Sequence, residues 1–81
     1  MFYYTYVLRS LKDRNLYIGW TNDLKSRVRE HNSSKVVATK SRIPFKLLYY
    51  EACLDKNRAI KREKQLKTGF GRAYLKRRIS I

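Results

Sequence analysis

The sequence predicts an α+β fold in which one three-stranded antiparallel sheet is flanked by helices, in the order ββαβαα. Two runs of aromatic and β-branched residues open the chain, separated only by a short polar segment. A third such run lies near the middle, and the segments before and after it have apolar residues at helical spacing. The length of 81 residues leaves room for one domain, which we expect to span residues 1–81.

The first two strands are expected at residues 2–8 and 16–20. Residues 2–8 (FYYTYVL) are almost entirely aromatic and β-branched, which is typical of strands. Residues 12–15 (KDRN) predict a polar turn, and the second run (LYIGW) follows it directly. Because the connection is so short, we expect the two strands to pair in antiparallel orientation.

A helix is expected after the second strand, up to about residue 31. The Thr-Asn-Asp segment at residues 21–23 offers side-chain oxygens that cap a helix and an acid that suits the first turn. Four side chains at positions i, i+3, i+4 and i+7 share the face that must pack on the sheet, namely Leu24, Arg27, Val28 and His31. A cation and a histidine are therefore expected on a packing face.

The second half of the chain predicts one strand and two helices. Residues 32–43 are polar and basic and predict an exposed loop, after which Pro44 opens a strand at residues 45–50. Asp55 or Asn57 can cap a second helix. Its packing face is expected to contain Ala59, Ile60, Glu63 and Leu66.

The end of the second helix is expected at Gly69 and Gly71, because glycine commonly follows the last helical residue. A short third helix is then expected at residues 72–78. Its sequence places apolar side chains on the inner side and cations on the outer side, with Tyr74, Leu75 and Ile79 inward and Lys76, Arg77 and Arg78 outward.

Charge narrows the class of partner. Lys and Arg total 20 against 6 Asp and Glu, which gives a net charge of +14. The positive charges repel one another in the folded state, and a polyanion such as nucleic acid is the partner that relieves this repulsion. No membrane association is expected, because no apolar stretch is long enough to span a bilayer and residues 2–8 are too short and polar for a signal peptide.

Composition also excludes several classes of site. The single cysteine excludes an internal disulfide and a thiolate zinc site, and it suits a cytoplasmic protein. The sequence contains no glycine-rich phosphate loop or serine triad, so no nucleotide cofactor is expected. Charge alone leaves open whether nucleic acid is cut or only held, as in a basic architectural or ribosome-associated protein.

Two charged side chains interrupt the expected packing faces. A carboxylate such as Glu63 is costly on an apolar face unless it is paired or bound to a metal. It can pair with a neighbouring cation, or it can ligate Mg²⁺, which often uses one or two carboxylates. Arg27 can extend its head into water, or it can bind a phosphate through its planar guanidinium. The residues alone leave these alternatives open.

Tyr6 and Tyr17 lie on the two strands that are expected to pair. Strand tyrosines are usually half-buried packing residues, and the chain has seven tyrosines. Gly19, two residues after Tyr17, would allow close approach by a substrate or a helix. These two phenols are therefore candidates for either packing or chemistry.

Together these residues resemble the GIY-YIG endonuclease superfamily, in particular its short stand-alone bacterial members, which are similar to the catalytic domain of an excision-repair nuclease. Residues 17–19 (YIG) are one half of the motif, and residues 4–6 (YTY) keep only the final tyrosine of the other half. Residues 20–32, 39–45, 51–53 and 59–69 resemble the family in the same order. The resemblance covers about residues 3–78 and implies the nuclease fold of that family.

The resemblance implies a metal-dependent endonuclease that hydrolyses phosphodiester bonds of nucleic acid, DNA rather than RNA, in repair or at specific structures, with one Mg²⁺ or Mn²⁺ ion. Tyr6 and Tyr17 match the motif tyrosines that orient and deprotonate the attacking water. Arg27 matches the helix arginine that stabilises the pentacovalent phosphate, and His31 matches a histidine that assists proton movement in some members. Glu63 matches the sole metal-binding carboxylate.

Basic residues are expected to grip the nucleic-acid backbone without reading bases, namely Lys25, Arg29, Lys35, Lys40, Arg42, Lys67 and Arg72. Trp20 stands where some excision-repair relatives have a lysine. If that lysine assists the leaving group there, either another cation serves here or the step is slower. With no accessory DNA-binding domain, little sequence specificity is expected, and a protein partner is one source that could supply it. The alternatives are a non-catalytic nucleic-acid-binding module on the same fold and an RNA-processing or ribosome-linked protein.

Overall fold

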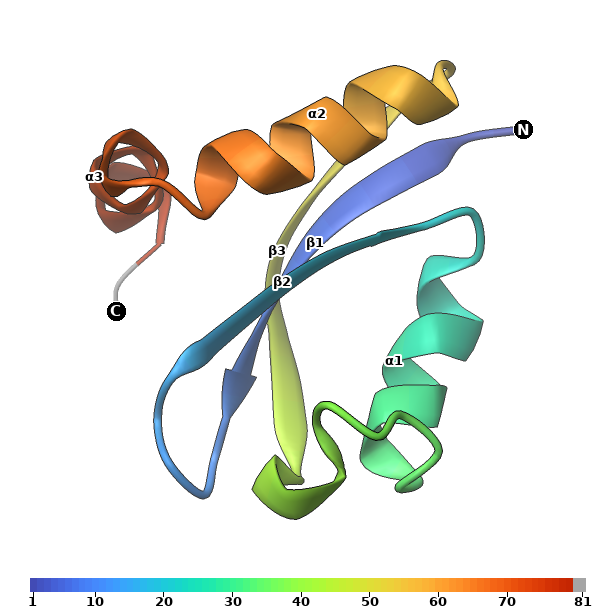
Figure 1. Cartoon of the computed structure of the whole chain (residues 1–81), viewed down its shortest axis with the longest axis vertical. Helices are drawn as coiled ribbons and strands as arrows, with labels where there is room; N and C mark the ends of the chain where they lie inside the picture. The colour runs from blue at the N-terminus through green and yellow to red at the C-terminus, as the bar shows by residue number, and fades with distance from the viewer. Residues whose placement is uncertain (80–81) are drawn as a thin grey trace.

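The computed structural model describes residues 1–79, which form three strands, three α-helices and one 3-10 turn in the predicted order (Figure 1). This arrangement confirms the α+β class. Among these residues, no helix combines the length and apolar character that crossing a membrane requires. The elements are β1 (Tyr3–Ser10), β2 (Leu16–Thr21), α1 (Leu24–Asn32), η1 (Lys40–Arg42), β3 (Phe45–Cys53), α2 (Lys56–Leu66) and α3 (Gly69–Arg78).

The sheet is antiparallel with β1 in the centre, in the order β2-β1-β3. Tyr6 of β1 is opposite Gly19 of β2 on one side and Tyr50 of β3 on the other. The pairing of β1 with β3 shifts by one residue between Val7 and Leu8. The short connection at residues 11–15 joins β1 and β2, which pair in antiparallel orientation as predicted. Strands β2 and β3 are the two edge strands of the sheet.

The helices cover opposite faces of the sheet, with α1 on one side and α2 and α3 on the other (Figure 1). Because successive strand residues point to opposite faces, β1 contributes to both cores. Tyr6 and Leu8 pack with Phe45 beneath α1, whereas Val7 packs with Leu66 and Leu75 beneath α2 and α3. A hydrogen bond of 2.9 Å from Thr5 Oγ1 to the Ala59 carbonyl also joins β1 to α2.

Side-chain caps fix where the first two helices begin. Asp23 accepts a hydrogen bond of 3.2 Å from the Ser26 amide at the start of α1. Of the two candidates for α2, Asp55 is the cap, and it accepts from the Asn57 amide at 2.9 Å. The third strand runs to Cys53, three residues beyond its predicted end, and residues 40–42 of the expected loop form η1.

The prediction that Gly69 and Gly71 end the second helix is wrong. Helix α2 ends at Leu66, and Thr68 caps α3 by accepting from the Gly71 amide at 3.2 Å, so both glycines lie in the first turn of α3. Gly71 is buried because α3 passes against the end of α2 there, where any Cβ would collide with the backbone of Leu66. A close approach between helices, not a helix stop, requires this glycine.

Candidate active site

Tyr6 and Gly19 define the centre of the candidate site, where β1 meets the edge strand β2. The Tyr6 side chain is 1% exposed and extends across β2. A Cβ at Gly19 would lie only 2.5 Å from the Tyr6 hydroxyl oxygen. The glycine of the YIG segment is therefore the residue that lets the phenol of β1 reach the edge of the sheet.

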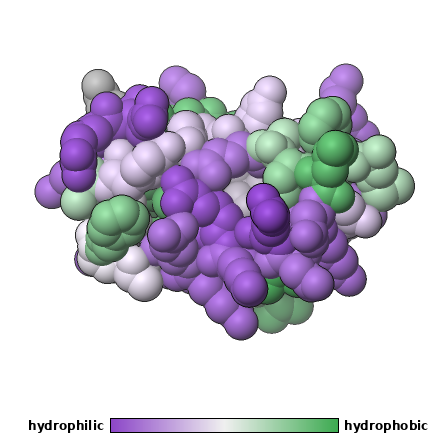
Figure 2. Space-filling view, turned by 90° about the horizontal axis from the view of Figure 1, so that it is seen from above, coloured by the Kyte–Doolittle hydropathy of each residue, from purple (hydrophilic) through white to green (hydrophobic). Residues whose placement is uncertain are grey.

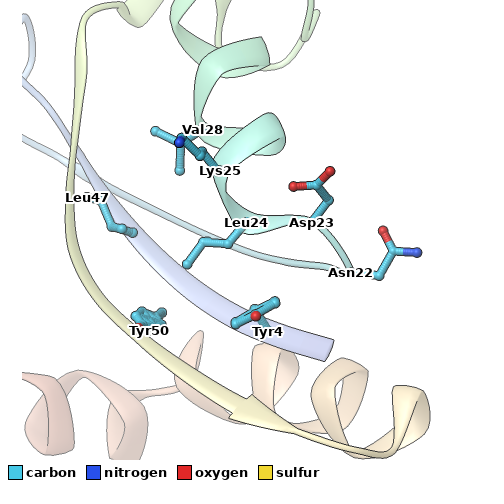
Figure 3. Close-up of a pocket in the computed structure, with 8 residues that line it drawn as sticks. All are labelled: Tyr4, Asn22, Asp23, Leu24, Lys25, Val28, Leu47 and Tyr50. Atoms are coloured by element: carbon cyan, nitrogen blue, oxygen red, sulfur yellow. The ribbon is translucent and has the colours of Figure 1, made fainter. Parts of the chain in front are cut away.

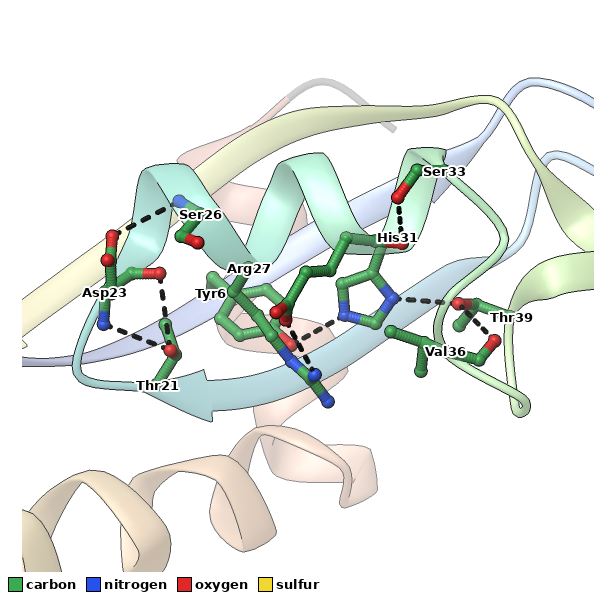
Figure 4. A network of polar contacts seen from close by, with 10 residues as sticks. Tyr6, Thr21, Asp23, Ser26, Arg27, His31, Ser33, Val36 and Thr39 are labelled. Carbon is green, nitrogen blue, oxygen red and sulfur yellow. Dashed lines mark hydrogen bonds and ion pairs between the residues drawn. The ribbon is translucent and has the colours of Figure 1, made fainter.

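A chain of hydrogen bonds continues from Tyr6 into α1 and the following loop (Figure 4). The Tyr6 hydroxyl lies 2.8 Å from His31 Nε2, and His31 Nδ1 lies 2.8 Å from Thr39 Oγ1. Thr39 Oγ1 donates to the Val36 carbonyl at 3.4 Å, so it accepts from Nδ1–H of the imidazole. This network places the free lone pair of His31 on Nε2, where it accepts the Tyr6 proton.

Burial keeps this chain uncharged. His31 has no solvent exposure, and its burial, assisted by the charge of Arg27, lowers its pKa to about 4. Burial also raises the pKa of Tyr6; Arg27 opposes this shift, while Tyr17 and Glu63 add to it. Both groups are therefore neutral near pH 7, and the Tyr6 oxygen keeps lone pairs for another donor.

Arg27 reaches the site from α1. Its guanidinium lies close enough to the Tyr6 hydroxyl to oppose the rise in the pKa of Tyr6, and it pairs with Glu30 at 3.1 Å. The side chain is 36% exposed and lines a cavity of about 370 Å³ together with Trp20 and Asn22. An arginine that is held by neighbours but open to water can bind a phosphate.

Tyr17 stands beside the same histidine from β2. Its ring packs edge-on against His31, with 4.9 Å between the ring centroids. It is half-buried and lines a second cavity of about 400 Å³ together with Lys67 and Arg72. Tyr17 thus packs against His31 and also lines a cavity whose rim carries two cations.

Glu63 approaches from α2, on the other side of the sheet. Its side chain is 17% exposed, and its charge is near enough to Tyr6 to raise the pKa of that phenol. Within residues 1–79, its carboxylate forms an ion pair with Lys67 at 3.7 Å but no hydrogen bond. The expected pairing with a neighbouring cation therefore exists, in a loose and partly exposed form.

The donor set around Glu63 suits only certain ions. In the part of the chain that the structure describes, no group of three or more His, Cys, Asp or Glu side chains could hold a metal. Mg²⁺ commonly binds through one or two carboxylates and keeps several waters, so a single partly buried carboxylate with only a loose ion pair among the described residues fits it. A closed zinc site would need four protein ligands and does not fit.

Most of the cations that are expected to bind the nucleic-acid backbone are exposed to solvent. The exposed ones are Lys25, Arg29, Lys35, Lys40, Lys67 and Arg72. Figure 2 shows a largely hydrophilic surface on the side where α2 and α3 lie. Arg42 differs, because it pairs with Asp13 at 2.6 Å and lies 5.4 Å from the centre of the Phe45 ring. It holds η1 against the β1–β2 turn.

Thr39 is the member of this cluster that the sequence analysis placed in an exposed loop. The structure buries it fully beside His31. The apolar run Val36, Val37 and Ala38 precedes Thr39, but Val37 is 80% exposed, so this run does not indicate that Thr39 is buried. A second contact that the sequence did not predict involves Trp20. The Lys56 ammonium lies 5.4 Å from the centre of the Trp20 ring.

Known proteins are similar to this chain in sequence and in fold. A UPF0213 protein of Syntrophus aciditrophicus is 44% identical over 66 residues, which cover 79% of this chain and 75% of the relative. One of Clostridium perfringens is 42% identical over 65 residues, which cover 79% and 69%. The solution NMR structure of a UPF0213 protein of Bacillus halodurans is similar with a TM-score of 0.55 and 32% identity, over 93% of this chain and 82% of that one.

The family comparison agrees with the resemblance in the sequence. The model of the GIY-YIG catalytic domain matches residues 2–78, which include both half-motifs and all of the elements described above. The chain therefore belongs to the GIY-YIG family of nucleases.

Proposed function

We propose that this chain is a single-domain, cytoplasmic endonuclease that uses one divalent metal ion to hydrolyse phosphodiester bonds of nucleic acid, with DNA as its substrate. The observation that carries the proposal is the grouping of Tyr6, His31 and Arg27 at the edge of β2, within electrostatic reach of Glu63. Titratable groups with perturbed pKa values cluster at functional sites, and here a buried phenol and a buried imidazole meet a partly exposed guanidinium at one sheet edge.

Each side chain has a distinct role in the proposal. Arg27 binds a non-bridging oxygen of the scissile phosphate and stabilises the charge that builds there; a fixed donor of this kind is typically worth about 10² to 10³ in rate. The Tyr6 hydroxyl donates to His31, so its oxygen accepts a hydrogen bond from the attacking water and orients it. Tyr17, at the mouth of the basic cavity, contacts the same water as base or relay.

The metal and the leaving group involve residues on α2. An Mg²⁺ or Mn²⁺ ion held by Glu63 would supply Lewis-acid stabilisation of the phosphate and the leaving 3′ oxygen. Lys56 lies over the ring of Trp20, the residue at the position where some relatives have a lysine. We assign to Lys56 the stabilisation of the leaving oxygen.

The exposed cations extend the binding surface around this site. Lys67 and Arg72 line the cavity next to Tyr17, and Lys25 and Arg29 lie on α1 with Arg27. Contacts of this kind bind phosphates and do not read base sequence. We therefore propose that specificity comes from the structure of the substrate or from a protein partner, in repair or a related process.

One contact favours a different function, that of a nucleic-acid-binding module without catalysis. The ion pair between Glu63 and Lys67 occupies the carboxylate that the metal requires. Such a module would bind nucleic acid with a steep salt dependence and would not cut it. Because the contact is 3.7 Å long and Lys67 is 54% exposed, a metal ion can displace it, and we favour the hydrolytic function.

The test compares cleavage of duplex, nicked and branched DNA and of structured RNA by the wild type, Glu63→Gln and Arg27→Ala, with Mg²⁺, Mn²⁺ or a chelator. Both variants should lose about 10²-fold or more in rate. Asp55→Asn and Arg58→Ala are matched controls, since asparagine still caps α2 and Arg58 is exposed. Undiminished cleavage in both site variants would place the activity elsewhere, and binding without cleavage by the wild type would favour the non-catalytic module.

A further inference from the structure

A larger cavity lies between α1 and the sheet, outside the candidate active site (Figure 3). Its volume is about 570 Å³, which is within the range of small-molecule sites. Tyr4 of β1 and Tyr50 of β3 form its floor, and Leu24 extends toward them from the first turn of α1. Helix α1 leaves this end of the sheet partly uncovered.

The floor of the cavity is aromatic and accessible. The rings of Tyr4 and Tyr50 meet edge to face, with 5.8 Å between their centroids and 61° between their planes. Tyr50 is 50% exposed although it lies on a strand that faces α1. Aromatic faces of this kind stack on nucleobases, whatever the base, because every base has a π-face.

The polar groups of the cavity favour a neutral group inside and a phosphate outside. Asp23 lines the wall, so its carboxylate would repel an anion placed in the cavity. The Asn22 amide offers a donor and an acceptor, which suit the edge of a base. Lys25 is exposed beside them and can bind a phosphate at the rim.

The cavity lies next to the site that holds Arg27. Asn22 lines both this cavity and the 370 Å³ cavity formed by Trp20 and Arg27. A nucleic-acid strand with its phosphate at Arg27 can therefore pass over the corner between β2 and α1 and place a neighbouring nucleotide above Tyr4 and Tyr50. The net charge of +14 supports a polyanionic occupant over an apolar peptide.

We infer that this cavity binds one unpaired nucleobase next to the scissile phosphate, by stacking on Tyr50 and Tyr4. The inference rests on the proposed function and names its substrate class. A base inside a continuous duplex must be unpaired and unstacked before it can enter, whereas a base in a flap, a junction or a single strand has no pairing to lose. The preferred substrate is therefore a strand with an unpaired nucleotide beside the cut.

Binding can be measured without turnover. The probe is a DNA oligonucleotide with 2-aminopurine at one unpaired position of a flap, and the reference is a continuous duplex of equal length; both are titrated with the Glu63→Gln protein without divalent metal. The flap should bind more tightly, with quenching of the 2-aminopurine fluorescence. Tyr50→Ala should weaken flap binding by about 5- to 150-fold, which corresponds to stacking of about 1–3 kcal/mol, and should leave duplex binding unchanged.

Two variants separate stacking from other effects. Tyr50→Phe keeps the aromatic face and should retain flap binding. Phe70→Ala removes an aromatic of similar exposure, 66%, from α3, and should have no effect on either substrate. Since Tyr50 is exposed, circular dichroism and thermal unfolding should show that all three variants fold. Equal affinity for flap and duplex, or full flap binding by Tyr50→Ala, would overturn the inference.

The remaining outcomes separate this inference from the proposed function. Flap binding that depends on Tyr50, without cleavage of any substrate by the wild type, would support the base cavity and contradict the nuclease. Equal cleavage of flap and duplex by the wild type and Tyr50→Ala would support the nuclease and contradict the cavity. If Tyr50→Ala instead reduces self-association in sedimentation and leaves flap binding intact, the face is an interface between copies, and the inference fails.

Discussion

The Tyr6 hydroxyl gains its role from neighbours on separate elements. Gly19 provides the space on β2, His31 accepts the proton from α1, and Arg27 faces the oxygen. Burial opposes ionisation of both Tyr6 and His31, so proton transfer from the phenol to the imidazole is strongly uphill in the free protein. In the proposed function this pair therefore orients water, and loss of a proton would require the charge of bound substrate and metal.

Thr39 should matter as a positioning residue for His31. Thr39→Val keeps the shape of the side chain but leaves the His31 Nδ1–H without its acceptor in a buried site, which should cost about 1–3 kcal/mol of stability. Cleavage should fall as well, because the imidazole no longer presents Nε2 to Tyr6. Urea unfolding, the cleavage rate and the nitrogen chemical shifts of His31 measure the three effects. Thr39→Ser keeps the hydroxyl, so its stability, cleavage rate and His31 shifts should match those of the wild type. If Thr39→Val and Thr39→Ser gave the same three results, the assigned tautomer of His31 would be wrong.

Stability should fall as the pH drops from about 6.5 to 4. The folded-state pKa of His31 is about 4 because of burial and the charge of Arg27, against 6.5 for an exposed histidine. Between these values the unfolded chain binds the proton and the folded chain does not, so acid favours unfolding. The loss should reach about 3 kcal/mol near pH 4, and full stability should be present above pH 6.5.

Urea unfolding at several pH values measures this dependence. His31→Gln should lower stability overall and remove the slope between pH 6.5 and 4. Asp13 is a separate case, because Arg42 lowers the pKa of its carboxyl to about 2, so its contribution is lost only as the pH falls from about 3.8 to 2. A slope of equal size in His31→Gln would show that another group is responsible.

At the scale of elements, the junction between α2 and α3 offers a paired test. Gly71 lies against the backbone of Leu66, whereas a Cβ at Gly69 would meet no atom within 4 Å. Gly71→Ala should therefore push α3 away from α2 and destabilise the fold by about 1–3 kcal/mol. Gly69→Ala should be neutral or stabilising by up to about 1 kcal/mol, since alanine is the better helix former. Thermal unfolding compares them, and equal effects would contradict the packing role of Gly71.

The sequence predicted the elements whose pattern is local. The aromatic and β-branched runs at 2–8 and 16–20 correspond to β1 and β2, and the helical spacing of Leu24, Val28 and His31 correctly gave the buried face of α1. Capping chemistry also gave Asp55 as one of two candidates. These features depend on side chains within a few residues of one another, which a sequence displays directly.

Features that depend on contacts between distant segments were missed. Gly71 looked like a helix stop, because its contact with the end of α2 is decided by the angle between two helices. Thr39 looked like a loop residue, because its partner His31 lies across a turn. The ion pair between Arg42 and Asp13, 29 residues earlier, was not predicted either. No local pattern encodes such partners.

At the scale of the whole molecule, the excess charge is spread over both sides of the sheet. Lys25 and Arg29 lie on α1, Lys35 and Lys40 follow it, and Lys67 and Arg72 flank the cavity beside Tyr17. Like charges so distributed repel one another in the free protein, and neutralisation by phosphates relieves that repulsion. Affinity for nucleic acid should therefore depend on many weak contacts more than on any single one.

This charge distribution predicts how binding responds to salt. The logarithm of the affinity for duplex DNA should fall linearly with the logarithm of salt concentration, with a slope of about −0.9 for each phosphate neutralised. Lys40→Gln and Arg72→Gln, each at an exposed cation, should reduce the size of the slope by about one and leave the free energy of unfolding unchanged.

Asp13→Asn combined with Arg42→Gln is the control. It removes an ion pair and keeps the net charge at +14, so it should lower stability and leave the slope unchanged. Fluorescence anisotropy between about 50 and 200 mM salt measures the slopes. A slope that changes with the Asp13–Arg42 pair but not with Lys40 or Arg72 would place the phosphate contacts at the β1–β2 turn, away from the candidate active site.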